Sequence, residues 1–573
     1  MEDLTGKSVQ FSNGRKGTII AQRPPMAFVL CDFAEWDESN ISSNDNNGNG
    51  EENVEVISIL SSRTLISVGD HLTGKILDCY GLNSDVTQSD ANDEEKNVQR
   101  EIFAPIPQIS DIALINSPLL TGTSMVDALA PIGKGQNMLV IGQESGVGQR
   151  ELLIGAIKSQ LSNTRKTNDN NDGKPLKCVY ALTTQDVKKR EEVLQTLKEE
   201  GLLDDIIVVV ARDHGVKDDK QDDNKNIMGS AEAITVAATA CSIGEAFALS
   251  RGEDAFVVVD DIDEHKSFWD WTTRVLVDIY GVDAVVKDDI NGGASSEMRG
   301  FYSSLIQRAG RFNQKNGSGS MTLTLLTDLE GKVTDDGEEN TVFSPEDFAD
   351  SSEKIKQRIS ILADKGIKLT PETLRKIQIP VPVASESEQK RRLALQHVDD
   401  LVSMSDGQIW FDEKLYEAGQ RPAIDPQRSI TRVGIGADTP CRADAPAMRT
   451  LAGGLRFNFA QAASLEGAGE NSGAERQILK RDSYLLAMHQ ESGEVRTLSE
   501  NCVALLASSL GLLDSTVQMG GKAGTELGSK KIKELLDHAW QTSPSIMNEI
   551  DQTLDISPSV QSELETITKE FLS

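Results

Sequence analysis

Residues 139–150 of the chain read LVIGQESGVGQR, an apolar run followed by a glycine-rich turn and the start of a polar stretch. This order of strand, glycine-rich turn and helix is typical of a phosphate loop, in which backbone N–H groups at a helix N-terminus bind phosphate. The candidate phosphate-binding residues of the turn are Gly142, Ser145, Gly146 and Gly148. The alternative is a turn that only connects a strand to a helix.

Two side chains differ from those of a hydrolytic phosphate loop. A working loop reads GxxxxGK[ST], where the lysine bridges the terminal phosphates and the hydroxyl holds magnesium. Here Gln149 and Arg150 follow Gly148, and the loop counted from Gly142 is one residue too long. Glutamine has no charge to place against phosphate, and arginine cannot ligate a cation. We therefore expect weak or absent nucleotide binding, with Arg150 free to pair with a phosphate or with Asp260 instead.

The surrounding residues alternate between apolar runs and helical stretches. The apolar runs are MLVIG at 138–142, CVYAL at 178–182, IIVVVA at 206–211, FVVVD at 256–260 and MTLTLL at 321–326. Strands that are apolar on both faces and separated by helices indicate a parallel sheet covered on both sides. The pattern predicts an α/β nucleotide-binding domain at 106–442. The FVVVD run ends in Asp260, which is placed to hold a magnesium ion through water.

Two further domains are predicted on either side. Residues 1–105 alternate apolar and polar positions in short runs broken by Gly, Asn and Pro, which predicts an N-terminal β-barrel. Residues 443–573 are helical in pattern, with Gly and Pro between the segments, and predict a C-terminal α-helical bundle. An acidic stretch with helical signals at about 331–400 is predicted to be a surface insertion in the central domain.

The charge and composition of the chain limit its partners. A formal net charge of -32 and a pI near 4.6 disfavour nonspecific binding to nucleic acid or to anionic lipid. We therefore expect no nucleic-acid partner. The apolar runs are strand-sized, so we also expect no direct membrane insertion. The six cysteines have no metal-ligand or CxxC spacing, which indicates a reducing compartment. The N-terminal MEDLTGKSVQF shows no targeting segment.

Several blocks of sequence resemble the alpha subunits of F-type ATP synthases, in the family's order. They are TG at 121–122, MVDALAPIGKGQ at 125–136, CSIGEAF at 241–247, FYSSLIQRA at 301–309, SDGQIWF at 405–411 and GQRPAIDPQRSITRVG at 419–434. PIGKGQ together with RPAI favours alpha over the beta, vacuolar or flagellar relatives. The resemblance extends from about residue 9 to the C-terminus. It implies a multidomain chain with a β-barrel, a RecA-like phosphate-loop domain and a helical bundle.

The resemblance also implies roles for individual residues. Arg432 matches the alpha-subunit arginine that reaches across an interface into a neighbouring catalytic site, where it can stabilise a transferring phosphoryl group. An ordinary surface salt bridge is the alternative. Arg421 and Pro422 match residues near the adenine of the family's own nucleotide pocket. Gln185 lies where a catalytic beta subunit has the glutamate that activates water, and an amide cannot act as a general base.

The main hypothesis is a non-catalytic alpha-type subunit of a proton-translocating rotary ATP synthase, which supports ATP synthesis and hydrolysis at a neighbouring subunit. The expected partners are catalytic beta-type subunits in a hetero-oligomeric ring and a central-stalk gamma-type subunit. The expected cofactor is ATP or ADP, with or without Mg²⁺. The expected location is peripheral, at the mitochondrial inner membrane, with the cytoplasm or a plastid as alternatives.

Departures from the family leave two other hypotheses open. The altered phosphate loop, the lack of the family's adenine-contacting glutamines in 461–472 and the lack of its N-terminal extension favour a diverged pseudo-ATPase that acts as a scaffold or accessory protein. We do not expect the peripheral-stalk contact that this extension makes. A self-contained, active NTPase is the third hypothesis. The retained Arg432 favours assembly with a catalytic neighbour.

Overall fold

The computed structural model describes residues 3–12, 14–24, 26–31, 56–82, 97–143, 146–168, 176–212, 223–281, 293–329, 358–359, 397–433, 443–465 and 472–572. The chain divides into two compact units. The first comprises Met1–Gly142, Gly146–Thr327 and Met404–Ser573, and the second comprises Gln143–Ser145 and Asp328–Ser403. Ser145 and most of the predicted insertion at 331–400 lie outside the described residues. The other candidate site residues belong to the first unit.

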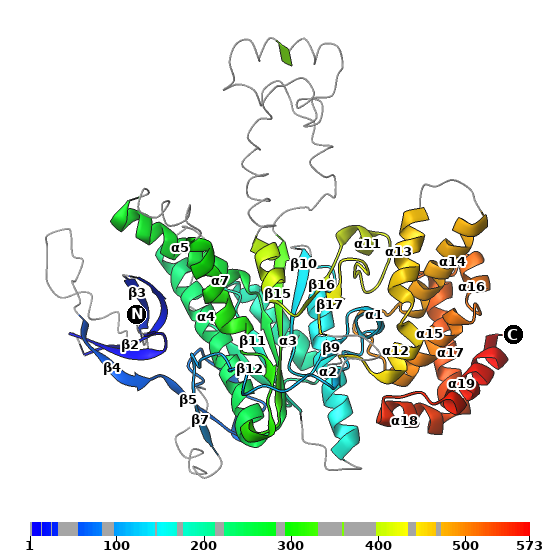
Figure 1. Ribbon diagram of the computed structural model, residues 1–573, viewed down its shortest axis with the longest axis horizontal. Coiled ribbons are helices and arrows are strands. Elements are labelled where there is room, and N and C mark those ends of the chain that lie inside the picture. Colours follow the sequence, from blue (N-terminus) through cyan, green and yellow to red (C-terminus); the bar gives the residue numbers. More distant parts are fainter. Residues whose placement is uncertain are drawn as a thin grey trace. The chain divides into compact units, whose positions relative to one another are not determined.

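The N-terminal part of the chain contains an antiparallel sheet (Figure 1). Its strands are β1 (Lys7–Phe11), β2 (Lys16–Arg23), β3 (Met26–Cys31) and β4 (Val56–Arg63), in the order β3-β2-β1-β4. A separate antiparallel pair consists of β5 (Leu65–Val68) and β7 (Val98–Glu101), and a 3-10 helix spans Asp70–Leu72. Ile20 and Phe28 pack in one cluster with Ile234 and Phe268 of the central domain. The predicted β structure of this region is present as antiparallel strands, and its closure into a barrel stays a prediction.

The central domain is built on a nine-stranded sheet. In spatial order its strands are β17 (Ile430–Thr431), β16 (Gly407–Trp410), β10 (Asn137–Gln143), β15 (Ser320–Leu329), β13 (Asp254–Asp260), β11 (Leu176–Leu182), β12 (Ile207–Val210) and β6 (Ile76–Leu77), and β14 (Gly310–Arg311) pairs with β15. The pairs β10–β16, β13–β15, β11–β13, β11–β12 and β12–β6 are parallel. The predicted parallel α/β core is therefore confirmed. One edge strand, β6, comes from the residues predicted to form the N-terminal domain.

Helices alternate with these strands along the chain. They are α2 (Gln149–Asn168), α3 (Val187–Glu199), α4 (Asp223–Ala246), a π-helix at Phe247–Arg251, α5 (Asp263–Tyr280), α7 (Gly293–Ile306) and a 3-10 turn at Gln314–Asn316. Upstream, β8 (Pro118–Leu119) and β9 (Ile132–Gly133) pair on either side of α1 (Ser124–Leu129). α3 begins after Asp186, whose carboxylate accepts hydrogen bonds from the N–H groups of Lys188 and Lys189, as an N-cap does.

Among the described residues, one helix is long and apolar enough to cross a membrane by length and composition. It spans Ile227–Arg251, and 89% of its most apolar stretch is buried inside the protein. α4 packs against β11, β13 and α5, so this apolar surface belongs to the core of the central domain. The apolar runs of the sequence are only strand-sized because Glu232 and Glu245, both buried, interrupt this helix.

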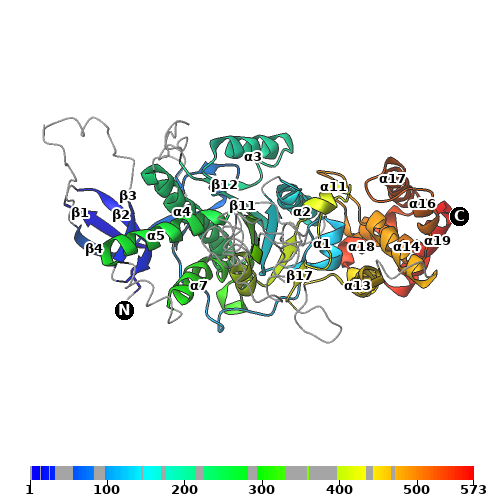
Figure 2. The same cartoon turned by 90° about the horizontal axis from the view of Figure 1, so that it is seen from above.

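The C-terminal part of the chain is helical, as predicted (Figure 2). Its helices are α12 (Pro446–Ala452), α13 (Leu455–Leu465), α14 (Ser472–Ala487), α15 (Leu498–Ser509), α16 (Asp514–Gln518), α17 (Glu526–Thr542), α18 (Pro544–Thr553) and α19 (Pro558–Leu572). α15 is contacted by α12, α14, α17, α18 and α19, and nearly all of its residues are buried. Thr497 and Glu500 form a capping box at its start, which satisfies backbone N–H groups at the helix N-terminus.

A buried charge network joins α4 to segments that are distant in the sequence. Arg308 Nε donates to Glu245 Oε1 at 2.6 Å, and the two side chains are 2% and 1% exposed. Arg100 Nε donates to the second oxygen of Glu245 at 2.9 Å. The other Arg308 nitrogens donate to two backbone carbonyl groups and to the Ser242 hydroxyl. Because these charges are out of water, each is tolerated only with its partner.

We predict that Glu245→Ala lowers the free energy of unfolding by about 3–5 kcal/mol, since it leaves the Arg308 guanidinium buried without its carboxylate. The matched control is Asp270→Ala, which removes an exposed partner of Lys266 on α5 and should cost less than about 1 kcal/mol. Paired urea titrations followed by tryptophan fluorescence measure both. Equal losses for the two variants would contradict a structural role for the buried network.

Candidate functional site

The candidate phosphate loop lies at the carboxyl end of the parallel strands. β10 ends at Gln143, and β11 and β13 end together, with Leu182 opposite Asp260. Gly142 is buried near the end of β10, and α2 begins at Gln149. In open α/β sheets, ligands bind outside the carboxyl ends of the strands. The sheet therefore brings the loop, Asp260 and the end of β11 to the edge where a nucleotide would bind.

The side chain of Gln149 binds the backbone of the loop that precedes it. Gly146 and Gly148 have φ angles of 66° and 106°, which favour glycine. A Cβ atom on Gly148 would lie 3.5 Å from the buried ring of Phe411, on which the loop rests. Gln149 is 1% exposed, and its Oε1 accepts a hydrogen bond from the Val147 N–H at 2.8 Å. The Gln149 amide thus satisfies a backbone donor of the kind that binds phosphate in other loops.

Arg150 pairs with Asp260 across the loop. Arg150 Nε lies 3.0 Å from both carboxylate oxygens of Asp260, and a terminal guanidinium nitrogen lies 3.0 Å from Oδ1. Asp260 is fully buried, whereas the Arg150 side chain is 22% exposed. Tyr180 donates its hydroxyl to Asp260 Oδ2 at 2.9 Å. Burial raises the pKa of Tyr180 well above its usual value, and the Asp260 charge raises it further, so the phenol stays a donor.

These residues do not fit a magnesium ion of the phosphate-loop type. The carboxylate that would hold the ion through water already accepts from Arg150 and Tyr180. The hydroxyl that would ligate the ion directly is replaced by the Arg150 side chain. Bringing Mg²⁺ beside the partly buried Arg150 guanidinium would place two cations together, which is electrostatically unfavourable. The cationic role at this position is filled from within the chain.

Gln185 is bound away from the loop. Its Nε2 donates to Glu264 Oε2 at 2.7 Å and to the Ser230 hydroxyl oxygen at 2.9 Å. Ser230 in turn donates to the same Glu264 oxygen at 2.8 Å. The amide also lies tightly against Gly229, where a Cβ atom would come within 2.2 Å of Gln185 Oε1. Gln185 therefore joins β11 to α4 and α5.

Acidic residues follow Asp260 directly. Asp261 has a φ of 90°, unusual for a residue other than glycine, and such strain occurs most often at functional sites. Burial raises the pKa of Asp261 well above its usual value, and the nearby charges of Asp263 and Glu264 raise it further. Asp261 Oδ1 accepts from the Asp263 N–H at 2.9 Å. Several carboxyl groups therefore lie together at the strand end, where they disfavour a polyphosphate without added cations.

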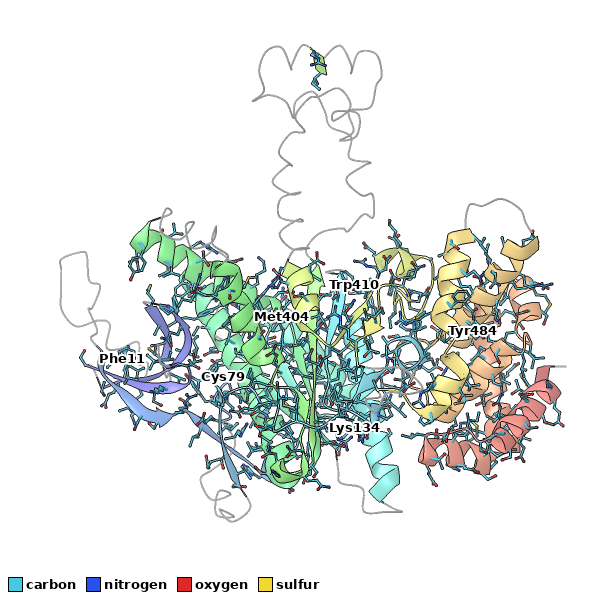
Figure 3. All side chains as sticks on the ribbon, viewed as in Figure 1. Phe11, Cys79, Lys134, Met404, Trp410 and Tyr484 are labelled. Carbon is cyan, nitrogen blue, oxygen red and sulfur yellow. The ribbon has the colours of Figure 1, made fainter. Side chains whose placement is uncertain are left out.

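Arg421 and Pro422 lie in the loop after α11 (Glu413–Glu417). The Arg421 guanidinium lies 3.4 Å from the centroid of the Tyr416 ring and donates to the Tyr416 carbonyl oxygen at 2.7 Å. The Arg421 carbonyl accepts from the N–H of Gln490 at 3.0 Å. Trp410 lies on β16 (Figure 3). The Arg428 guanidinium lies 3.6 Å from the centroid of its ring. Arginine–aromatic stacking thus orders this loop.

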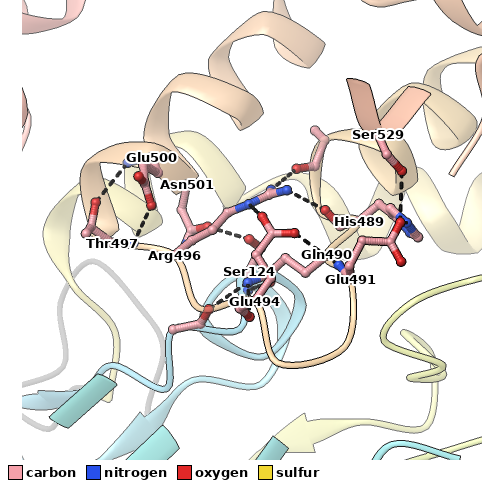
Figure 4. A network of polar contacts seen from close by, with 12 residues as sticks. Ser124, His489, Gln490, Glu491, Glu494, Arg496, Thr497, Glu500, Asn501 and Ser529 are labelled. Atoms are coloured by element: carbon pink, nitrogen blue, oxygen red, sulfur yellow. Dashed lines mark hydrogen bonds and ion pairs between the residues drawn. The ribbon is translucent and has the colours of Figure 1, made fainter. Parts of the chain in front are cut away.

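A loop of the C-terminal domain, residues 489–497, holds the start of α1 (Figure 4). Gln490 Oε1 accepts from the Ser124 N–H at 2.6 Å, and Gln490 Nε2 donates to the Gly122 carbonyl at 2.8 Å. Gly122 has a φ of 74°, and a Cβ atom there would lie 2.3 Å from Val495. Glycine is therefore required at this contact, which explains the TG pair of the resemblance.

Two cavities lie apart from the phosphate loop. One of about 630 Å³ is lined by residues of the loop 489–497 and by α17. The other, of about 680 Å³, is lined by residues of the N-terminal sheet, α5 and α7. Neither has a lining residue from 139–150. The chemistry suggested by the sequence therefore rests on the loop and its partners, and not on either cavity.

Arg432 lies at the opposite edge of the sheet from the phosphate loop. β17 is antiparallel to β16, with Thr431 opposite Gly407, and β16 is parallel to β10, with Gln408 opposite Leu139. Arg432 thus lies beyond the amino end of β10, and the length of β10 alone puts roughly 17 Å between it and the loop. Arg432 is exposed. Its guanidinium donates to the Ser405 carbonyl at the amino end of the sheet.

Comparisons with known proteins agree with the sequence resemblance. The nucleotide-binding domain of the ATP synthase alpha/beta family matches residues 122–270. The ATP synthase subunit alpha of Acetivibrio thermocellus is 24% identical over 516 residues, which cover 88% of this chain and 79% of that protein. ATP synthase subunit alpha 2 of Vibrio campbellii is 24% identical over 529 residues, and ATP synthase subunit alpha of Actinobacillus succinogenes is 25% identical over 524; each match covers 88% of this chain and 80% of the relative.

The chain is therefore similar to F-type ATP synthase alpha subunits over most of its length, and residues 122–270 match the nucleotide-binding domain of the ATP synthase alpha/beta family. The structure joins Arg150 to Asp260, two of the residues that the sequence singled out. Gln185 binds Glu264 and Ser230, and Arg432 follows β17 at the amino end of the sheet. The expected nucleotide-binding domain is present, and the relatives named above are bacterial proteins.

Several residues that bind the candidate site residues or the segment before the loop were not predicted from the sequence. Tyr180 gave one signal, because a hydroxyl-bearing side chain stands in an otherwise apolar, buried strand. Glu264 follows Asp260 by four residues, but nothing in the sequence linked it to Gln185. Gln490 lies more than 360 residues from Ser124, and only the fold brings them together.

We predict that Arg150→Ala lowers the free energy of unfolding by about 3–5 kcal/mol, because Asp260 is left buried without its cation. Adding Asp260→Asn should recover most of this loss, since no buried charge then remains. Denaturant titrations of the two single variants and the double variant form a double-mutant cycle. Lys158→Ala is the control, because Lys158 lies on the same helix in an exposed pair with Glu200. A double variant that loses the sum of the single losses would refute the coupling.

Proposed function

We propose that the chain is a non-catalytic alpha-type subunit of a proton-translocating rotary ATP synthase, and that it supplies Arg432 in trans to the catalytic site of a neighbouring beta-type subunit. The similarity to ATP synthase alpha subunits supports a hetero-oligomeric complex with beta and gamma subunits. The observation that carries the proposal is the position of Arg432, exposed beyond the edge strand β17 and remote from the loop of its own chain. This position supports a role for Arg432 in a neighbouring subunit.

The chain's own site supports a non-catalytic role. Gln149 is bound to its own loop, Arg150 occupies the carboxylate of Asp260, and Gln185 is bound to Glu264. A catalytic site would use the side chains at these three positions to bind phosphate, to bind the metal ion and to activate water. In this chain each of the three side chains binds another part of the same chain. We infer that this site binds ATP or ADP weakly or not at all.

The same internal contacts give the second candidate, a pseudo-ATPase that acts as a scaffold outside the synthase. The two proposals differ in whether Arg432 matters to a partner. We place the subunit peripherally on the membrane that holds the complex. The mitochondrial inner membrane is the location proposed from the resemblance, with the cytoplasm or a plastid as alternatives. Co-purification with beta-type and gamma-type subunits from the native source tests whether the chain assembles into the complex.

We predict that the isolated parent chain shows no ATP hydrolysis and that Gln149→Lys with Arg150→Thr tightens Mg-ATP binding by at least about tenfold, or roughly 1.4 kcal/mol. The lysine restores charge at the phosphates, and the threonine restores the metal ligand and frees Asp260. Titration calorimetry measures binding. The control is Gln149→Met with Arg150→Ala, which breaks the same contacts and restores neither group. Strong Mg-ATP binding by the parent chain would overturn the inferred weak site.

We predict that Arg432→Ala leaves assembly nearly unchanged and lowers ATP turnover by the complex by about 10³ to 10⁵. The exposed side chain contributes little to the core of its own chain, so the loss arises in the partner's site. Arg432→Lys should rescue poorly, because an ammonium lacks the planar fork that spans two phosphate oxygens. Steady-state hydrolysis by purified complexes carrying each variant is the measurement. If both variants turn over like the parent, the scaffold proposal is the better one.

A further inference from the structure

Three sequence blocks that are far apart in the chain meet at Arg432. They are the end of PIGKGQN, the start of SDGQIW and the end of SITR. The Arg432 N–H donates to the Asp406 carbonyl at 2.7 Å, and a guanidinium nitrogen donates to the Ser405 carbonyl at 2.7 Å. Both ends of Arg432 therefore rest on the short turn made by Ser405 and Asp406. The stability of that turn decides where the guanidinium lies.

The turn is fastened to β10 by a reciprocal clasp between Asp406 and Asn137. Asp406 Oδ2 accepts from the Asn137 backbone N–H at 3.1 Å and from Asn137 Nδ2 at 2.9 Å. Asn137 Oδ1 accepts in return from the Asp406 N–H at 2.8 Å. Three hydrogen bonds between two residues fix both position and orientation. Burial raises the pKa of Asp406, while the hydrogen bond from Asn137 and the Arg432 charge oppose this shift.

A neighbouring amide connects the clasp to β17. Gln136 is fully buried, and its Nε2 donates to the Thr431 hydroxyl oxygen at 2.9 Å and to the Asp406 carbonyl at 3.2 Å. β17 has only two residues, so its pairing with β16 alone is a weak anchor. The clasp and Gln136 therefore hold the end of β17, because the strand is too short for its pairing with β16 to fix it alone.

We propose that Asp406 is a positioning residue for Arg432, which acts through its clasp with Asn137 to hold the turn that orients the guanidinium toward the neighbouring catalytic site. This inference rests on the proposed function in trans. The physical reason is preorganisation. A loose arginine side chain has about 2 kcal/mol of rotamer entropy, and a displacement of about 1 Å at a catalytic group can cost on the order of 10²-fold in rate.

The test is steady-state ATP hydrolysis by the assembled complex. Asp406→Ala is expected to lower kcat by about 10²-fold, with KM within about twofold, because a misplaced arginine weakens transition-state contacts more than substrate binding. Asp406→Asn keeps one oxygen that can accept both Asn137 donors, so it should stay within about threefold of the parent. Adding Asp406→Ala to Arg432→Ala should cause no further loss.

Two further variants keep the test decisive. Asn137→Ala breaks the clasp from the other side and should reproduce the kcat loss, so it decides the matter if Asp406→Ala does not assemble. Asp78→Ala is the control, because Asp78 likewise accepts from backbone N–H groups, those of Tyr80 and Leu82, next to β6 at the far end of the sheet. It should leave kcat within about twofold.

The outcomes separate this inference from the proposed function. If Arg432→Ala has parental activity, the role in trans fails and takes the inference with it. If Arg432→Ala is impaired while Asp406→Ala or Asn137→Ala has parental kcat, the role in trans stands and the positioning role is wrong. A double variant that multiplies the two single losses would also overturn it, because Asp406 would then act independently of Arg432.

Discussion

The carboxylate of Asp260, fully buried at the end of a central strand, requires a cation, and the arrangement of the phosphate loop follows from that requirement. A hydrolytic phosphate loop meets it with a hydrated metal ion. Here Arg150 meets it directly, with Tyr180 as a further donor. Since Arg150 is in the first turn of α2, the pair fixes the helix to the sheet in the absence of any ligand. The neighbouring Gln149 completes the closure by binding the loop's own backbone.

The two edges of the central sheet carry different groups. At the carboxyl edge, the groups that could have bound nucleotide and metal are bound to one another. At the amino edge, an exposed arginine rests on a turn that is fastened by buried side chains. A chain that has only a supporting role can lose the first set without losing the second, because roughly the length of a strand separates them. This separation explains how an altered loop and the SITR segment can occur in the same chain.

Sequence reasoning predicted the parallel α/β core, the β structure of the N-terminal region and the C-terminal helices, because each depends on local patterns of apolar residues and on Gly, Pro and capping signals. It also picked out Arg150 and Asp260 as a potential pair from chemistry alone. It did not anticipate β6, which lies among the residues of the first predicted domain and pairs with β12. Strand pairing between distant segments is decided by tertiary packing, which a local pattern does not encode.

The sequence by itself determined which chemical groups are present: an amide and a guanidinium where a lysine and a hydroxyl would stand, an amide at position 185, and an arginine in SITR. Only the tertiary structure decided where those groups act. The register of β17 on β16 and of β16 on β10 sends Arg432 away from its own loop, and the clasp of Asp406 with Asn137 joins residues 269 positions apart. The reason is that the residue type at each position is a local property of the chain, whereas the location of a side chain relative to other residues depends on pairing between distant segments.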